Sequence, residues 1–336
     1  MHTDSTIDVS ILVVSYNTRA MTLACLDSIA AETLTARYET IVVDNASSDG
    51  SADAVRTHAS APTTIALARN AGFARGNNLA AEHARGRYLL LLNPDTVILD
   101  GAIDRLIAFA RRTPEAGIWG GRTLFADGRL NPSSCWSRMT PWSLFCRASG
   151  LAVLFSGYEL FNGEAFGGWR RDRERRVDIV SGCFLLIERA LWERLGGFDP
   201  LFFMYGEEAD LCLRAEALGA RPMITPDATI IHHGGASERV RADKLVRLLA
   251  AKASLIRRHW RGPVRPVGLL LHAAWPLTRM LARQVAAAVS RRSSAREAAS
   301  TWREVWRRRA EWRQGYRHMT AVGDDAAADA RIGAAA

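Results

Sequence analysis

The chain has 336 residues, 48% of them hydrophobic, and a formal net charge of +9 at pH 7. This length and apolar content exclude an intrinsically disordered protein and predict one large domain plus an appendage. The five cysteines are scattered without CxxC spacing, which excludes a zinc site built from them and is typical of reduced thiols in a cytoplasmic protein. Residues 1–10 are polar and the next apolar run is short, so we expect no secretory signal.

The charge is unevenly distributed along the chain. Residues 237–336 hold 21 basic and 8 acidic residues, a net charge of +13, whereas residues 1–236 carry −4. A near-neutral body with a basic extension predicts an anionic surface as partner, and we expect this to be a membrane. The expected organisation is a body over residues 1–236, a helical basic extension over 237–320 and a disordered tail over 321–336.

Strand and helix patterns alternate over the first 112 residues. The expected elements are strand 9–14, helix 18–31, strand 40–43, helix 52–58, strand 64–67, helix 74–84, strand 88–92 and helix 99–112. This order predicts an α/β fold with a Rossmann-like, mostly parallel sheet covered by helices on both faces. Ligands of such sheets bind at the carboxyl ends of the strands, where Asn17, Asp44 and Asp95 fall.

The middle of the chain lacks a clear period. Residues 127–176 mix glycine, proline, arginine and aromatic residues, which predicts an irregular, partly helical insertion lying over the active edge of the sheet. Its aromatic side chains either contact an acceptor or pack the insertion onto the body. We therefore divide the body into a nucleotide-binding half, about 1–126, and an acceptor half, about 127–236.

The basic extension is predicted to be helical. Residues 243–260 form an amphipathic pattern, and residues 264–289 are apolar but interrupted by proline and arginine, too often for a membrane span. In residues 296–318, Trp302, Trp306 and Trp312 fall on one helix side among arginines. That pattern favours a helix at a membrane interface, and the alternative is a helix that packs on protein.

Three strings follow the first strands. Val14–Asn17 reads VSYN, Val42–Ser51 reads VVDNASSDGS and Arg69–Ala80 reads RNAGFARGNNLA. In the second string Asp44 ends a strand, and its carboxylate can accept hydrogen bonds from a pyrimidine N3–H or from ribose hydroxyls. The third string supplies small residues, backbone N–H groups and Arg75, which suit a phosphate.

Three further strings suit metal and acid–base chemistry. Leu89–Thr96 reads LLLLNPDT, a buried strand that delivers Asp95 into a loop. Gly206–Asp210 reads GEEAD at an expected helix start, and His232 begins the string HHGG after an expected strand. A hard carboxylate oxygen and a neutral imidazole suit Mn²⁺ or Mg²⁺, and an acidic pair can supply a general base.

With these strings in this order over about residues 9–236, the chain resembles the family-2 glycosyltransferases of the GT-A fold, in their bacterial rhamnosyltransferase-like branch. The resemblance implies inverting transfer of a sugar from a nucleoside diphosphate to an acceptor hydroxyl. The residues that it assigns to the nucleotide-sugar are Ser15, Asn17, Asp44, Asn45, Asn70, Gly72, Arg75, Asn77 and Asn93.

The same resemblance assigns the metal ligands and the base. Asp95 and His232 are expected to bind the divalent cation, Mn²⁺ or Mg²⁺. Glu208 matches the residue that deprotonates the acceptor, but Glu stands where the family usually has Asp, so Glu207 stays open as the base. Asp210 is expected either to act directly in catalysis or to pair with an arginine of the body.

The resemblance also implies the partners. We expect a dTDP-linked donor, with rhamnose as the sugar, and a UDP-linked donor as the alternative. The acceptor is expected to be lipid-linked or a polysaccharide, in cell-envelope glycan synthesis. The protein is expected to lie on the inner face of the cell membrane, peripherally and without a nucleic-acid partner, and its oligomeric state stays open.

Other functions fit the residues less well. A sugar nucleotidyltransferase would carry a glycine-rich basic loop directly after the first strand, and Ser15–Met21 lacks one. A dinucleotide-dependent enzyme would show GxGxxG at the same place. A non-enzymatic nucleic-acid-binding protein would use the basic tail, but the tail's aromatic residues follow a helix and not the sheet of an OB or RRM domain.

Overall fold

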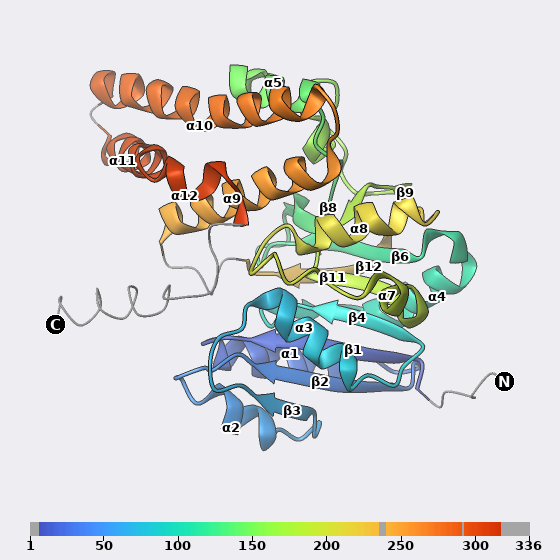
Figure 1. Cartoon of the computed structure of the whole chain (residues 1–336). Coiled ribbons are helices and arrows are strands. Elements are labelled where there is room, and N and C mark those ends of the chain that lie inside the picture. The colour runs from blue at the N-terminus through green and yellow to red at the C-terminus, as the bar shows by residue number, and fades with distance from the viewer. Residues whose placement is uncertain (1–6, 235–239, 291, 317–336) are drawn as a thin grey trace.

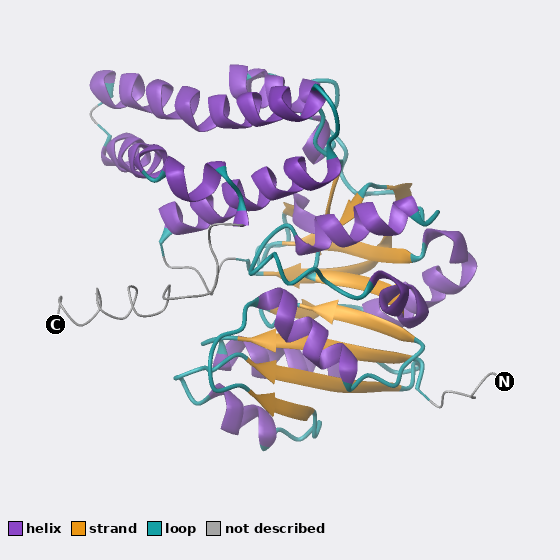
Figure 2. Ribbon diagram, in the orientation of Figure 1, coloured by secondary structure: helices purple, strands orange, loops and turns teal. Residues whose placement is uncertain are grey.

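A ten-stranded mixed sheet forms the centre of the protein in the computed structural model, which describes residues 7–234, 240–290 and 292–316 (Figures 1 and 2). The strand order along its main path is β3-β2-β1-β4-β11-β6-β12-β5. The first four of these strands are parallel: β1 (Val9–Ser15), β2 (Tyr38–Asp44), β3 (Thr63–Ala66) and β4 (Tyr88–Leu92). They are the four strands that the sequence predicts within the first 112 residues, and their carboxyl ends meet at one edge.

The other half of the sheet is mixed. β11 (Phe184–Glu188) runs antiparallel to both β4 and β6 (Ile118–Leu124). β12 (Met223–His232) runs parallel to β6 and antiparallel to the short edge strand β5 (Thr96–Ile98). The sequence analysis did not predict β5, whose pairing sets Thr96 opposite His232 and so brings two distant motifs together.

Helices cover both faces of the sheet, as predicted. One face packs on α1 (Arg19–Glu32), α2 (Ser51–Arg56) and α4 (Ala102–Arg112). The other packs on α3 (Phe73–Glu82), α7 (Arg189–Leu195) and α8 (Glu207–Ala217). Successive residues of β1 alternate between the two cores because strand side chains alternate, and burial on both faces explains the unbroken apolar run of this strand.

The insertion predicted for residues 127–176 is irregular and partly helical. It contains α5 (Pro141–Ser149), α6 (Leu151–Leu154) and the two-residue strands β7 (Leu130–Asn131), β8 (Cys135–Trp136) and β9 (Arg175–Arg176); β10 (Ile179–Val180) follows and pairs with β8. We expected the insertion to lie over the active edge of the sheet. Its helix α5 instead packs against α10 (Val264–Val289) (Figure 1).

A buried ion cluster holds this insertion to the C-terminal helices. Glu164 is 5% exposed, and its Oε2 accepts from Lys252 Nζ at 2.8 Å and from Arg147 Nη2 at 3.0 Å. Burial raises the pKa of the Glu164 carboxyl, but the two cations more than offset this and lower the pKa to about 2. Because a buried charge needs partners, this pairing fixes the insertion on the helical layer.

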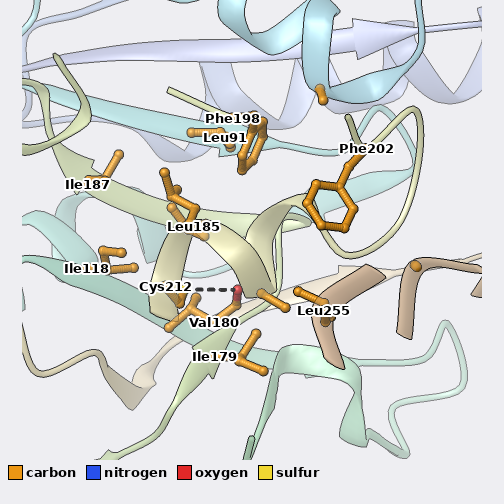
Figure 3. Packing of buried hydrophobic residues seen from close by; sticks show 14 of the residues in the cluster. Leu91, Ile118, Ile179, Val180, Leu185, Ile187, Phe198, Phe202, Cys212 and Leu255 are labelled. Atoms are coloured by element: carbon orange, nitrogen blue, oxygen red, sulfur yellow. Dashed lines mark hydrogen bonds between the residues drawn. The ribbon is translucent and has the colours of Figure 1, made fainter. Parts of the chain in front are cut away.

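The C-terminal helices share the core of the sheet. They are α9 (Arg241–His259), α10, α11 (Ser293–Arg307) and α12 (Arg309–Arg313). Leu255 of α9 belongs to the same buried cluster as Leu91 and Leu185 of the sheet, and Figure 3 shows it near Phe202 and Cys212. Residues on both sides of the expected boundary at 236 therefore pack as one unit. The expected disordered tail, 321–336, lies outside the described residues.

The tryptophan-bearing side of the C-terminal helices contacts other parts of the protein. Trp312 and Val305 are fully buried, and the Trp312 indole N–H donates to the Val305 carbonyl at 2.9 Å. The Trp302 ring lies 6.0 Å from Trp275, and Trp306 lies 6.3 Å from Trp312. Trp312 therefore packs on protein, as the alternative states, whereas Trp302 and Trp306 are only partly buried, and contact of this helix side with a membrane stays a prediction. No helix in the described parts of the chain is long and apolar enough to cross a bilayer.

Candidate active site

The loop after β4 and the end of β12 bring Asn93, Asp95 and His232 together. Asp95 is 5% exposed, and its Oδ2 accepts from the Gly234 N–H at 2.9 Å. Its Oδ1 lies 3.4 Å from His232 Nε2, and Asn93 Nδ2 lies 3.3 Å from the same nitrogen. The pairing of β5 with β12 fixes this arrangement, which unites two of the predicted metal-site residues.

His232 is held in place by its surroundings. Its carbonyl accepts from Asn131 Nδ2 at 3.2 Å, and its buried Nδ1 has no hydrogen-bond partner among the described residues. Burial lowers the pKa of His232, but the neighbouring Cys183 and Asp95 side chains outweigh it and raise the pKa to about 10. Neither Asn131 nor Cys183 belongs to a predicted motif, because both reach the site only through the tertiary fold.

The pair Asp95 and His232 fits a divalent cation. Mg²⁺ holds its ligands at about 2.1 Å, so neighbouring ligand atoms in an octahedron lie roughly 3 Å apart. The separation of 3.4 Å between Asp95 Oδ1 and His232 Nε2 is compatible with two neighbouring ligands of one ion. Within the described residues, no group of three or more His, Cys, Asp and Glu side chains is placed to hold a metal.

Two glutamates stand at the start of α8, and neither forms an ion pair with a described residue. Glu207 is 4% exposed and Glu208 is partly exposed, and Oε2 of each has no hydrogen-bond partner among the described residues. Burial raises the pKa of both carboxyls, and the pKa of Glu207 is raised further by the neighbouring Glu208. Two adjacent carboxyls with raised pKa values are typical of acid–base sites.

The glycine before β11 shows which way Glu208 lies. A Cβ built on Gly182 would be 3.8 Å from Glu208 Cβ and 3.4 Å from the Phe73 ring. The next residue, Cys183, accepts from the Asn93 N–H at 3.2 Å. Glu208 therefore lies beside the strand end that carries Asn93. The sequence motif alone did not distinguish Glu208 from Glu207.

Asp210, two residues after Glu208 in α8, contacts three basic side chains. It is fully buried and lies 2.7 Å from Arg214 Nε, 2.7 Å from Arg258 Nε and 2.9 Å from His259 Nε2. Burial raises the pKa of Asp210, but these partners outweigh it and lower the pKa. The geometry matches the ion-pair alternative for Asp210 and joins α8 to the end of α9.

Two buried acceptor oxygens, one at the end of β2 and one in α3, have no hydrogen-bond donor among the described residues. Asp44 is 2% exposed; its Oδ1 accepts from the Ser47 N–H at 3.0 Å, whereas its Oδ2 has no partner. Asn77 is 1% exposed and donates to the Phe73 carbonyl at 3.0 Å, but its Oδ1 has no partner. Because buried polar atoms are nearly always hydrogen-bonded, both oxygens are candidates to accept from a ligand.

Other predicted nucleotide contacts hold the loops instead. Asn17 Oδ1 accepts from the Ser48 N–H at 2.8 Å, Asn45 Oδ1 from the Ala71 N–H at 2.7 Å and Asn70 Oδ1 from the Gly72 N–H at 2.9 Å. The Ser15 hydroxyl is fully buried, 2.9 Å from the Thr22 hydroxyl. These side chains shape the strand-end loops, and Arg75 is exposed on the first turn of α3.

Gly72 lets the loop before α8 dock on the predicted nucleotide loop. It has φ +84°, and a Cβ there would lie 2.5 Å from the Phe203 carbonyl oxygen. That oxygen accepts from the Phe73 N–H at 2.9 Å. A side chain at position 72 would separate the two loops, so this glycine brings the Glu207–Glu208 pair close to the start of α3.

The C-terminal helices hold the other side of the same loop. The Tyr316 hydroxyl donates to the Met204 carbonyl, and its ring packs edge-on against Phe202 at 5.8 Å. Arg258 pairs with Asp199 at 2.7 Å. The sequence analysis missed this support because it expected the segment 296–318, which includes Tyr316, to lie at a membrane interface.

Comparison with protein families gives a match over residues 10–195, more than half of the chain, to the family described as glycosyl transferase family 2. Among curated proteins, the O-antigen biosynthesis protein RfbC of Myxococcus xanthus is 30% identical over 71% of this chain, although the match covers only 18% of RfbC. N-acetylglucosaminyl-diphospho-decaprenol L-rhamnosyltransferase of Mycobacterium tuberculosis is 29% identical, covering 67% of this chain and 78% of that protein.

Among solved structures, a mannosyltransferase of Pyrobaculum calidifontis, in complex with GDP-Man and Mn²⁺, matches with a TM-score of 0.54. It is 20% identical, and the match covers 90% of this chain and 86% of that one. At this identity the likeness shows the fold alone.

Proposed function

The chain belongs to glycosyl transferase family 2, and from this premise we propose that it transfers a sugar, with inversion, from a nucleoside diphosphate to an acceptor hydroxyl. One observation carries the proposal most directly. Asp44, the Asp95–His232 pair and Glu208 come from four separate motifs, and all lie at or beside the carboxyl-end edge of the parallel strands. Such an edge is where α/β sheets bind nucleotides.

For donor binding, we propose that the nucleotide lies along the ends of β1 and β2. The free Asp44 Oδ2 would accept from the base or ribose, and Asn77 Oδ1 offers a second acceptor. Arg75 at the start of α3 is exposed and suits a phosphate oxygen. Ser15, Asn17, Asn45 and Asn70 would contribute by fixing the loops, and Asn93 would hydrogen-bond the donor.

We propose that Asp95 and His232 hold a divalent cation, Mn²⁺ or Mg²⁺. Two protein ligands leave several coordination positions to oxygen atoms of the donor diphosphate and of water. Bound there, the cation supplies positive charge that stabilises the diphosphate as a leaving group. The protein itself would position the two ligands: the Gly234 N–H bonds the Asp95 carboxylate, and the Asn131 amide bonds the His232 carbonyl.

For the acceptor, we propose Glu208 as the general base. Its carboxylate would take the proton of the acceptor hydroxyl as that oxygen forms the new bond to the anomeric carbon and the bond to the diphosphate breaks. Burial raises the pKa of Glu208, which makes its carboxylate a stronger base near neutral pH. Glu207, more deeply buried, would lie beside it with its own pKa raised by burial and by Glu208, and Asp210 would hold α8 in place.

The donor sugar and the acceptor are proposed from the relatives. The name of the mycobacterial relative, a rhamnosyltransferase acting on a lipid diphosphate, supports rhamnose as the sugar and a lipid-linked acceptor. We propose dTDP-rhamnose as donor, with a UDP-linked sugar as the alternative, and a lipid-linked or polysaccharide acceptor in cell-envelope glycan synthesis. The basic extension, over residues 237–320, would then lie at the inner face of the membrane that carries the acceptor.

A panel of nucleotide-sugars tests this function. Each compound is added to the protein with Mn²⁺, and thermal unfolding and release of nucleoside diphosphate are measured. We expect dTDP-rhamnose to raise the unfolding temperature more than the free sugar does, and to release dTDP. Release of pyrophosphate would identify a nucleotidyltransferase instead, and protection by no nucleotide-sugar would contradict the proposal.

A further inference from the structure

Exposed apolar side chains concentrate on one part of the protein. Of the nineteen large apolar side chains that are exposed in the described residues, thirteen belong to two segments, 141–160 and α10, which pack against each other. They are Trp142, Phe145, Val153, Leu154, Phe155, Tyr158 and Leu160 in the first segment, and Val264, Val267, Leu270, Leu281, Val285 and Val289 in the second. Scattered exposed apolar residues need no explanation, but thirteen of them on two segments that pack against each other indicate a binding surface.

The six residues of α10 lie on one side of the helix. At 100° per residue they fall within an arc of about 120°. The buried residues of α10, namely Gly268, His272 and Pro276, lie on nearly the opposite side, where the His272 ring packs on Trp312 and hydrogen-bonds the Leu249 carbonyl. Figure 1 shows α10 beside α5 in the helical layer away from the sheet, and the exposure of the six residues shows that the apolar side of α10 faces solvent.

The charges around this surface are almost all positive. α10 contains no acidic residue. Arg261, Arg265, Arg279 and Arg283 make no ion pair with a carboxylate of the described residues. In the segment 141–160 the one acidic residue, Glu159, is bonded to Arg175 at 3.1 Å. At about 100° per residue, Arg265, Arg279 and Arg283 fall on the side of α10 opposite the apolar arc. This division into an apolar side and a basic side is typical of a helix that lies at an anionic membrane interface.

We propose that the exposed side of α10 and the adjoining segment 141–160, together the α10 face, bind an anionic lipid bilayer with α10 lying in the plane of the headgroups. α10 is not a spanning helix, and its apolar arc matches a helix whose one side enters the headgroup and acyl boundary. Arginines near such a surface strengthen binding to anionic lipids.

This inference rests on the proposed function, because an enzyme with a lipid-linked acceptor works at the membrane surface. It names a surface different from the one that the sequence indicated. Of the arginine-flanked tryptophans, Trp312 is fully buried, and Trp302 and Trp306 are partly buried against other aromatic rings. The sequence analysis considered α10 only as a membrane span, which it does not fit. The C-terminal helices therefore support the catalytic loop with one side and bind the bilayer with the other.

Cosedimentation with vesicles tests the proposal. The variant carries Leu270→Gln, Leu281→Gln and Val285→Gln, at positions that are 70%, 51% and 66% exposed, so the core is untouched. The matched control carries Met21→Gln, Leu34→Gln and Leu218→Gln, which are exposed apolar residues outside the α10 face. Vesicles contain phosphatidylcholine alone or with about one third phosphatidylglycerol.

We expect the wild type and the control to bind the anionic vesicles, and the α10 variant to bind them at least tenfold more weakly. Arg265→Gln with Arg283→Gln should weaken binding to anionic vesicles only, and added salt should have the same effect. Should the glutamine variant fail to fold, the arginine variant and the single change Val285→Gln still test the α10 face.

Three results would overturn the proposal: no wild-type binding to anionic vesicles, equal binding by wild type and α10 variant, or equal binding to neutral and anionic vesicles. A dimer in solution that the same glutamines dissociate would assign the α10 face to a second copy instead. Donor binding, followed by thermal shift with dTDP-rhamnose, should be the same in all variants. Its loss in every protein, wild type included, would count against the proposed function and not against the α10 face.

Discussion

At the scale of single residues, Asp95 has two oxygens with separate tasks. Oδ2 accepts from the Gly234 N–H, and Oδ1 lies beside His232 Nε2. We predict that Asp95→Ala removes most transfer activity and the divalent-dependent part of donor affinity, by about 10²-fold. Titration of the donor with Mn²⁺ and with a chelator measures this loss. Full activity of Asp95→Ala in the presence of a chelator would contradict the metal assignment.

The buried pair Glu207 and Glu208 makes stability depend on pH. Both carboxyls have raised pKa values, so the folded state holds protons that the unfolded chain releases above about pH 4.3. The pair therefore destabilises the folded protein increasingly as pH rises from the unfolded pKa through the folded one. We predict that Glu207→Gln raises the unfolding temperature at pH 7 and much less at pH 4. A lower unfolding temperature at pH 7 would show that Glu207 has a favourable partner.

The sequence indicates candidate site residues by their type and position, but it does not give their geometry. Asp44, Asp95, Glu208 and His232 lie in strings whose spacing places them at element ends. Whether an amide such as that of Asn45 faces a ligand or a backbone N–H depends on how two loops pack, and here it accepts from Ala71. No local pattern carries that information.

At the scale of elements, α8 is fixed by Asp210 rather than by its own cap. Asp210 is fully buried against Arg214, Arg258 and His259, and its pKa is lowered. We predict that Asp210→Asn costs roughly 2–4 kcal/mol of stability at pH 7, because it removes the buried anion with which three partly exposed basic side chains pair. A group with a lowered folded pKa contributes its stability above the unfolded pKa, so the cost should shrink below about pH 4.

Denaturant unfolding of Asp210→Asn across pH measures this cost, and Asp27→Asn, at an exposed helix position, is the control. Transfer by folded Asp210→Asn at low temperature should stay within about tenfold of wild type if the residue acts through position. A folded, equally stable Asp210→Asn without activity would instead give Asp210 a direct catalytic role.

Periodicity predicted the regular elements well and their irregular neighbours poorly. The strands and helices up to residue 112 lie within a few residues of their expected bounds, because each is a continuous apolar or amphipathic run. β5 was missed because three residues after a turn carry no period. The helix with Trp302, Trp306 and Trp312 was expected to contact lipid. An apolar stripe shows that one side of a helix is covered, but it does not show whether lipid or protein covers it.

At the scale of the whole protein, the sheet and the C-terminal helices form one cooperative unit. Trp312, Leu255 and Leu185 belong to one buried cluster, which composition could not reveal, because charge separates the two parts of the chain. We predict one calorimetric unfolding transition for the whole chain. Trp312→Ala should lower its temperature, at a cost of about 3–5 kcal/mol, without splitting it. Two separate transitions would show that the helices are an independent domain.

The central claim is that this family-2 enzyme deprotonates its acceptor with Glu208. The most direct measurement is the rate of sugar transfer from dTDP-rhamnose, or from the donor that the panel selects, by the wild type, Glu208→Gln and Glu207→Gln, with donor affinity measured in parallel. We predict that Glu208→Gln binds donor as the wild type does but transfers at least about 10²-fold more slowly, whereas Glu207→Gln keeps most of its rate. A crippled Glu207→Gln beside a nearly normal Glu208→Gln would contradict this assignment.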